Sequence, residues 1–227
     1  MSFVSWQFAL FLALVFALYW RLPHRGRILL LLTASYFFYG AWDARFLALL
    51  LTSTTVDFLC AQAIAGQRLP PVKVFGFACL PASWLVLYSC LPASWRNGPA
   101  ITPASLAAAA AFPLIFAAAH QLLWRKLAAS RPRNFLVLSL GINLGLLGFF
   151  KYFNFFAGSA AALLATVGWP AGWTLLNIIL PVGISFYTFQ SISYTVDVYR
   201  GRTRPTGDFP TFATYIAFFP QLVAGPI

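Results

Sequence analysis

The sequence contains no glutamate, and its acidic residues are four aspartates. Charged residues make up 8% of the 227 residues, against about 25% in an ordinary soluble domain. Hydrophobic residues make up 61%, and a core of ordinary size cannot bury that much apolar surface. The composition therefore excludes a soluble globular domain. The cysteines, Cys60, Cys79 and Cys90, lack metal-ligand spacing, so we expect them to pack in apolar surroundings and predict no metal site.

The net charge of +11 lies in short gaps between apolar runs. Such a pattern is typical of membrane topology and not of a nucleic-acid-binding stripe, so we expect lipid and not nucleic acid as a partner. The first apolar run follows no basic residue and ends in Tyr19 and Trp20, which favours a retained membrane helix over a cleavable signal peptide.

Apolar runs of suitable length predict an all-α, polytopic integral membrane protein with about eight transmembrane helices. A short gap at Ala41–Arg45 predicts a tight turn between the second and third helices. The predicted spans are Phe3–Trp20, Ile28–Trp42, Phe46–Ala65, Val72–Leu91, Pro103–Trp124, Asn134–Phe156, Trp173–Val196 and Phe209–Ile227.

Basic residues alternate between the gaps that separate these spans. Twelve of the fifteen lie in the first, third, fifth and seventh gaps, and two lie in the even gaps. Because cytoplasmic loops carry an excess of lysine and arginine, this asymmetry predicts cytoplasmic odd gaps and an N-terminus outside.

Two ionisable residues interrupt the apolar runs. Asp57 is either a carboxyl group hydrogen-bonded to a neighbouring helix or part of a proton or substrate pathway. Lys151 either extends its amine to the outer interface or faces a polar cavity and meets an anion. Upstream, Gly141 and Gly145 form a small-xxx-small pair around Asn143, which indicates close helix packing.

Polar residues follow one face of the seventh predicted helix, at alternating spacings of four and three. This seam is either a structural hydrogen-bond network or the wall of a substrate passage, and the spacing leaves both open. Asp197 and Arg200 are three residues apart and could pair. The seam residues are Gly183, Tyr187, Gln190, Tyr194 and Asp197, with Thr188, Ser191 and Thr195 beside them.

The last predicted span contains Pro220, Gly225 and Pro226. These residues free backbone carbonyls from helical hydrogen bonds, which is tolerated at membrane depth only where protein or a water-filled cavity satisfies them. A broken helix is therefore predicted here, and it is a hint of function.

Four stretches of the sequence, together with Ser193, Tyr194, Asp197 and Tyr199–Gly201, resemble the membrane-bound O-acyltransferase family. Within it, the chain is similar to the branch of the alginate O-acetyltransferase membrane subunits, with the D-alanyl-teichoic-acid transferases as relatives. The stretches are Ser35–Asp43, Asn143–Phe156, Pro181–Gln190 and Phe218–Ile227.

The resemblance implies that residues 1–227 form the N-terminal part of a single transmembrane domain, and thus an incomplete fold of that family. Residues 69–130, with two predicted spans, resemble an insertion relative to the branch. The family's catalytic histidine lies downstream of the run that ends at Ile227, so we expect a fragment of a longer chain. His24 and His120 lie outside the family's motifs, and no catalytic residue is assigned here.

For the complete protein, the resemblance implies acetyl transfer from a cytoplasmic thioester donor to an extracytoplasmic polysaccharide such as alginate. The donor would be acetyl-CoA or another acyl thioester, with no bound cofactor, and a periplasmic or carrier protein would assist. The location implied is the bacterial inner membrane. Residues expected to line or support the acyl passage are Lys151, Tyr187, Gln190, Tyr194, Asp197 and Gln221. Residues expected to hold the motif's structure are Pro181, Gly183, Arg200, Pro220, Gly225 and Pro226.

Two other interpretations fit the same residues. A transporter or flippase would also combine a broken helix, the intramembrane Asp57 and a basic cytoplasmic side. A non-catalytic remnant would leave its polar seams facing lipid, and we expect the 227-residue chain alone to be inactive.

Overall fold

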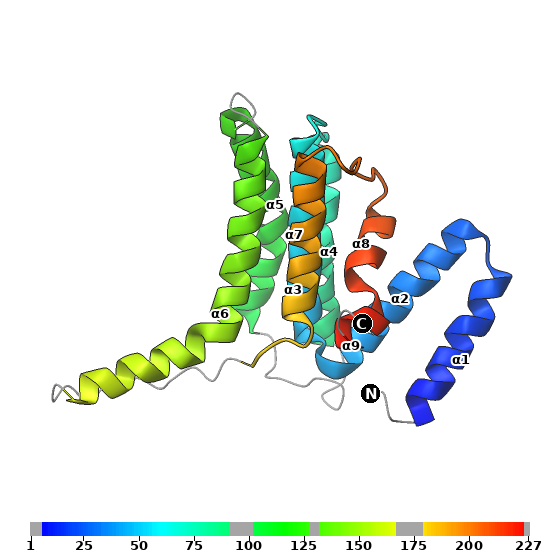
Figure 1. Cartoon of the computed structure of the whole chain (residues 1–227), viewed down its shortest axis with the longest axis horizontal. Helices are drawn as coiled ribbons and strands as arrows, with labels where there is room; N and C mark the ends of the chain where they lie inside the picture. The colour runs from blue at the N-terminus through cyan, green and yellow to red at the C-terminus, as the bar shows by residue number, and fades with distance from the viewer. Residues whose placement is uncertain (1–5, 91–101, 128–131, 167–178, 225–227) are drawn as a thin grey trace.

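The computed structural model describes residues 6–90, 102–127, 132–166 and 179–224. Within these ranges the regular structure is helical and no strand occurs, which confirms the all-α prediction (Figure 1). The helices are α1 (Trp6–Arg21), α2 (His24–Asp43), α3 (Arg45–Ile64), α4 (Pro71–Cys90), α5 (Pro103–Leu127), α6 (Arg133–Thr166), α7 (Ile184–Tyr199), α8 (Phe209–Ala217) and α9 (Phe219–Ala224).

Helix α3 forms the centre of the bundle. It packs against α2, α4, α6, α7 and α8, and 83% of its most apolar 18-residue window is buried. Its polar residues Ser53, Thr54 and Asp57 are each no more than 1% exposed. This burial allows hydroxyl and carboxyl groups on a membrane helix, because they face protein and not hydrocarbon.

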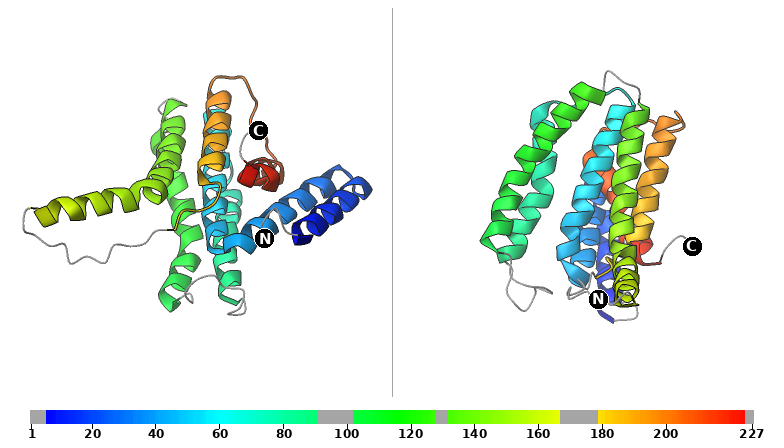
Figure 2. Two further views of the ribbon diagram at one scale, coloured as in Figure 1. Left: turned by 60° about the horizontal axis from the view of Figure 1, so that its bottom comes forward. Right: turned by 90° about the vertical axis from the view of Figure 1, so that its left-hand side faces the viewer.

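The other helices surround α3. Helices α4 and α5 lie along one side of it, where α4 packs on α3 and α5 packs on α4, and α6 and α7 pack together and on α3 along the opposite side (Figure 2). Helix α8 packs on α2 and on α3, and α9 contacts both α2 and α7. Phe58 of α3 links α4 to α8, because its ring meets Phe77 of α4 and Phe209 and Phe212 of α8 at centroid distances of 5.3–5.8 Å.

A single residue, Ala44, separates α2 from α3, which confirms the tight turn predicted there. The Arg45 guanidinium donates to both carboxylate oxygens of Asp43 across this turn, at distances from 2.6 to 3.2 Å. Trp84 Nε1 of α4 donates to the Ala44 carbonyl over 2.7 Å. The turn is therefore held from both of its helices and from α4.

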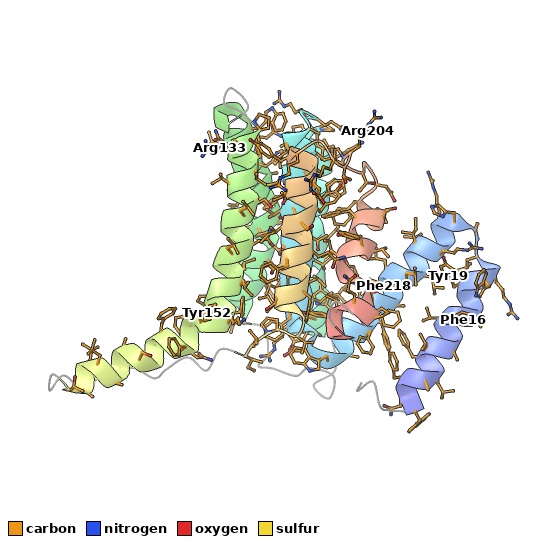
Figure 3. The ribbon with its side chains drawn as sticks, viewed as in Figure 1. Phe16, Tyr19, Arg133, Tyr152, Arg204 and Phe218 are labelled. Atoms are coloured by element: carbon orange, nitrogen blue, oxygen red, sulfur yellow. The ribbon has the colours of Figure 1, made fainter. Side chains whose placement is uncertain are left out.

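Helix α6 is longer than the sixth predicted span. It contains 34 residues, and its length of about 51 Å exceeds the hydrocarbon thickness of about 30 Å. The ribbon bends sharply near Tyr152, and the remainder turns away from the bundle (Figures 1 and 3). The span was predicted to end at Phe156, but the helix continues to Thr166.

Length and composition qualify three of the described helices as membrane spans, namely α3, α4 and α6. Helix α1 and residues Leu106–Leu122 of α5 are shorter apolar helices. The chain is thus a helical protein with apolar, membrane-type helices, and the count of eight spans stays a prediction.

The seventh and eighth predicted spans differ most from the structure. Residues Ile179–Gly183 are not helical, so α7 begins at Ile184 and has 16 residues, while residues 173–178 of the predicted span lie outside the described residues. The eighth predicted span is two short helices, α8 and α9, which meet at Phe218 with ψ 110°. The predicted break therefore exists, and it lies at Phe218, before Pro220; Gly225 and Pro226 lie outside the described residues.

The described helix ends beside the third, fifth and seventh connections lie at one end of the bundle. Helices α3, α5 and α7 end there, and α4 and α6 begin there, while α1 and α2 meet to one side of the bundle (Figure 1). Arg133, at the start of α6, and Arg204, after α7, both lie at this end (Figure 3). This end of the bundle therefore carries basic residues from more than one odd-numbered connection, which agrees with the predicted topology.

Candidate functional site

The break between α8 and α9 leaves two backbone groups without their helical partners. In a continuous helix the Phe219 N–H would donate to the Tyr215 carbonyl, four residues earlier. Instead Gln190 Nε2 of α7 donates to that carbonyl over 2.7 Å, and the Phe219 N–H donates to Ser35 Oγ of α2 over 3.2 Å. Side chains of two other helices thus satisfy the groups that the broken helix frees, as membrane depth requires.

Gln190 also meets Gln221 of α9. Its Nε2 lies 3.4 Å from Gln221 Oε1, while Gln190 is half-buried and Gln221 is exposed. Pro220, in the first turn of α9, has no N–H to donate, and the Gln221 N–H donates to the Phe218 carbonyl over 3.1 Å. The carboxamides of Gln190 and Gln221 thus lie together beside the break.

Gly183 allows the start of α7 to approach α9. It caps α7 in the left-handed region at φ 73°, and a Cβ built there would lie 2.6 Å from the Leu222 carbonyl oxygen. Any other residue would meet both a strained backbone and this contact. The expected structural role of Gly183 thus has a physical cause. Buried Pro181 begins the same turn, and its carbonyl accepts from the Ile184 N–H.

The connection from α7 to α8 is held at Thr206. The Thr206 N–H donates to the Tyr194 hydroxyl over 3.0 Å, and Gln62 Nε2 of α3 donates to the Thr206 carbonyl over 2.5 Å. The Tyr194 ring lies against that of Phe212 of α8, with centroids 4.8 Å apart. Tyr194 therefore links α7 to the next helix through both its ring and its hydroxyl.

The predicted seam of α7 does not lie on one buried face. The buried residues of α7 include one of the predicted seam, Tyr187, and three predicted beside it. They are Ile184, Tyr187, Thr188, Ser191, Thr195 and Val198. Gln190 and Tyr194 are half-buried and reach α8, α9 and their connections. The predicted seam is therefore rotated around the helix axis relative to the buried face, because polar character and not burial defined it.

Asp197 and Arg200 do not form an ion pair in the structure. Asp197 Oδ1 lies 3.9 Å from Nη1 of Arg202, while Arg200 is exposed and caps α7 through its backbone. With 38% of the Asp197 side chain and 68% of the Arg202 side chain exposed, this pair contributes about 0–1 kcal/mol. Asp197 therefore lies at the end of α7, away from the break.

Asp57 is the centre of a separate polar cluster between α3, α6 and α7. Its Oδ1 accepts from Ser139 Oγ and from Asn143 Nδ2, each over 2.7 Å, and Ser53 Oγ donates to Asn143 Oδ1 over 3.3 Å. Ser191 of α7, which is fully buried, lies near the carboxyl group. Contacts to neighbouring helices therefore match the hydrogen-bonded interpretation of Asp57, although a pathway role stays untested.

Lys151 lies apart from the Gln190 and Gln221 pair. It is exposed, and its Nζ stands 5.4 Å from the centroid of the Tyr152 ring, at the bend of α6 (Figure 3). Helix α6 packs on α3 and α7, whereas α9 packs on α2 and α7. Upstream, a Cβ built on Gly141 or Gly145 would meet nothing within 4 Å, so the close packing expected of these glycines is absent.

Sequence reasoning missed three residues that hold this site together: Ser35, Gln62 and Thr206. Ser35 lies within a stretch that carried the family resemblance, but no role was assigned to it. Gln62 near the end of an apolar helix was a signal that could have been used, because a membrane helix seldom keeps an unpartnered amide. Its partner, a backbone group more than a hundred residues later, could not be identified from the pattern.

Comparison with known proteins relates the chain to named O-acetylases. A Pseudomonas putida protein named "Probable alginate O-acetylase AlgI" is 32% identical over 220 residues, which cover 96% of this chain and 33% of that protein. The protein of the same name from Pseudomonas aeruginosa is 36% identical over 218 residues, covering 96% and 31%. A Helicobacter pylori peptidoglycan O-acetyltransferase is 36% identical over 119 residues, covering 42% and 22%.

These matches to proteins named as O-acetylases and O-acetyltransferases confirm the resemblance to the membrane-bound O-acyltransferases. Within it, the relatives whose similarity covers nearly all of this chain are named as alginate O-acetylases. The chain spans about a third of the length of these curated relatives. No family model and no solved structure matches it.

Proposed function

We propose that this chain is part of a membrane-bound O-acetyltransferase that transfers an acetyl group to a hydroxyl group of an extracytoplasmic polysaccharide. The observation that carries the proposal is the similarity over 96% of the chain to proteins named alginate O-acetylase. Alginate is the acceptor that these names favour, and a peptidoglycan O-acetyltransferase among the relatives keeps the acceptor class at polysaccharides in general.

The donor in this proposal is acetyl-CoA or another acyl thioester on the cytoplasmic side of the bacterial inner membrane. The helix ends beside the third, fifth and seventh connections lie at one end of the bundle with basic residues, which supports a cytoplasmic location for that end. The acetyl group then crosses the protein and reaches the acceptor directly or through a periplasmic or carrier protein. The catalytic histidine that the family resemblance implies stays a prediction.

Within the described residues, the Gln190 and Gln221 pair is the best candidate for the wall of the acyl passage. Both amides lie where the helix is broken, and both retain exposure that a passing acyl group needs. Tyr187 is 2% exposed, and the Tyr194 hydroxyl binds a backbone N–H, so these tyrosines position the passage wall without lining it. Lys151 and Asp197 would serve the passage only near its two ends, because both lie apart from the break.

Gln190→Ala in the intact protein tests this function. It removes the donor to the Tyr215 carbonyl and one amide of the pair, so the backbone at the helix break and Gln221 are no longer held in place. We expect the acetyl ester content of the exopolysaccharide to fall by about tenfold to a hundredfold, as misplacement near a reacting centre does. The measurement is polysaccharide acetylation in cells whose own enzyme is deleted, together with the variant's level in the membrane.

Phe189→Ala is the matched control, since Phe189 is the neighbouring residue on α7 and is 58% exposed. It should leave acetylation and membrane level near those of the unmodified protein. Unchanged acetylation in Gln190→Ala would remove this site from the proposal. If cells with the intact protein lacked acetylated polysaccharide but exported another substrate, the transporter interpretation would replace the acetyltransferase proposal.

A further inference from the structure

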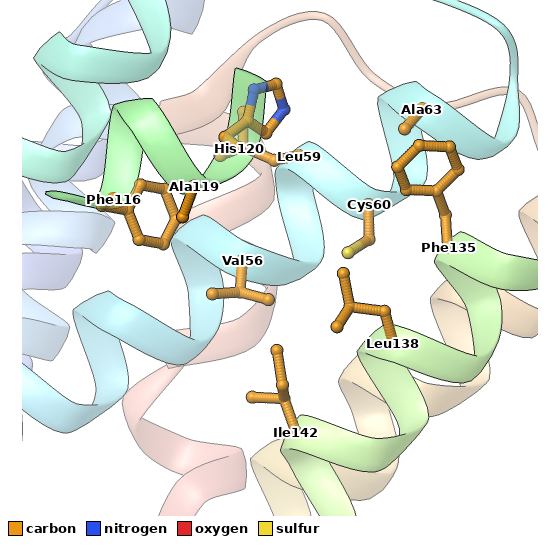
Figure 4. A pocket seen from close by; sticks show the side chains of 10 residues that line it. All are labelled: Val56, Leu59, Cys60, Ala63, Phe116, Ala119, His120, Phe135, Leu138 and Ile142. Carbon is orange, nitrogen blue, oxygen red and sulfur yellow. The ribbon is translucent and has the colours of Figure 1, made fainter. Parts of the chain in front are cut away.

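A groove opens between α3, α5 and α6, away from the Gln190 site. Helix α5 packs mainly on α4, and α6 packs on α3 and α7, so a cavity remains between α5, α6 and a buried face of α3. The groove encloses ≈ 100 Å³ (Figure 4). Its floor runs along α3 from Val56 to Ala63, a length of about 10 Å.

The walls of the groove are apolar along most of this length. Phe116 and Ala119 come from α5, and Leu138 and Ile142 come from α6. The outer surfaces of both wall helices are apolar as well, because Ile115 is 66% and Val137 is 57% exposed. The groove therefore opens on a surface that is suited to hydrocarbon.

One end of the groove has a different character. His120 lines it there, and its ring lies over Trp124, which in turn meets Phe135 at the opposite wall with centroids 5.4 Å apart. Arg68 interacts electrostatically with His120, and its Nη2 donates to Gln121 Oε1 over 3.2 Å. Arg133 begins α6 two residues before Phe135, and both arginines are exposed.

We infer that this groove binds an acyl chain of an anionic phospholipid, whose phosphate lies at Arg68 and Arg133. An apolar trough with cationic groups at one end matches the amphiphilic shape of a lipid, and basic pockets between membrane helices suit anionic headgroups. The described residues place no acidic side chain at this end of the groove.

The groove depends on residues 69–130, which the sequence predicts to be an insertion. The α5 wall lies within that segment, so relatives without it would lack the groove. The lipid site would then be a property of this chain and not of acetyl transfer. Lipid binding at this site is therefore measured by the amount of bound lipid, independently of acetyl transfer.

The test compares lipid binding by the intact protein, purified in detergent and reconstituted in nanodiscs of phosphatidylcholine or of phosphatidylcholine with phosphatidylglycerol. Lipid retained after extraction is counted by native mass spectrometry. We expect retention of phosphatidylglycerol over phosphatidylcholine, and an about fivefold loss of that preference in each of Arg68→Gln and Arg133→Gln. These exposed residues can be changed without disturbing the core.

Arg204→Gln is the matched control, because Arg204 is exposed at the same end of the bundle but follows α7 (Figure 3). It should retain the full preference. Ala63→Phe, which fills the floor, should abolish retention of both lipids while leaving the protein monodisperse in detergent. Equal loss in Arg204→Gln, or undiminished retention in Ala63→Phe, would overturn the inference. A groove that retains no lipid in the unmodified protein would overturn it as well.

Discussion

Ser35, Gln62, Gln190 and Tyr194 each bind a backbone group of the segment that follows α7. Such bonds matter more here than in water, because an unpaired backbone group within lipid costs several kcal/mol. Gln190 was identified from its sequence, since an amide within an apolar helix is conspicuous. Its partner was not, because a carbonyl is freed only where the fold breaks α8 from α9.

Asp57 allows the free-energy cost of unpaired hydrogen-bond donors in the bundle to be measured. Asp57→Ala should destabilise the protein by about 2–5 kcal/mol, because it leaves Ser139 Oγ and Asn143 Nδ2 without their shared acceptor. Asp57→Asn should cost far less, since an amide oxygen can accept both bonds. Thermal unfolding in detergent, followed by size-exclusion fluorescence, checks both. Equal losses in the two variants would mean that the negative charge itself is required.

At the scale of the elements, apolar runs located most helices and placed several of their ends poorly. The ends of α2 and α3 were close to prediction because Asp43 and Arg45 interrupt the apolar pattern. Helix α6 was predicted to end at Phe156 because a bilayer length was assumed, although apolar residues continue to Thr166. The start of α7 was placed too early, because hydropathy does not reveal that Gly183 adopts a left-handed conformation.

Gly183 joins two elements, so its substitution tests their contact. Gly183→Ala should lower stability by about 2 kcal/mol or more, because it combines φ 73° with a 2.6 Å contact to the Leu222 carbonyl oxygen. Gly141→Ala is the control: that glycine is helical with open space around it, so alanine should be neutral or stabilising. Detergent melting curves of the two variants would be compared. A stable Gly183→Ala protein would show that α7 and α9 do not approach so closely.

Across the whole molecule, charge asymmetry predicted which connections share one end, and the structure brings together the helix ends beside the third, fifth and seventh of them. The packing of the helices around α3 could not be predicted, because it depends on shape complementarity between residues distant in sequence. The polar cluster at Asp57 illustrates this, since Ser139 follows Asp57 by 82 residues. A hydropathy pattern gives the elements and their direction, but not their neighbours.

The predicted orientation can be measured with thiol labelling. Cys90 is exposed at the end of α4, and Thr203 is exposed in the connection after α7, at the opposite end. In cells with a permeabilised outer membrane, an impermeant maleimide should label Cys90, whereas a Thr203→Cys variant that lacks Cys90 should react only after lysis. Buried Cys60 provides an internal reference for an unreactive thiol. The reverse pattern would place the N-terminus in the cytoplasm.

The single-residue link at Ala44 also bears on how the chain is made. Asp43 and Arg45 neutralise each other across it, and no spacer lets α2 and α3 part. Helix α3 is apolar enough to span a membrane, but its aspartate and hydroxyl groups are buried only when other helices surround it. We therefore expect α2 and α3 to enter the bilayer together as a hairpin, which would give the centre of the bundle its first partner during synthesis.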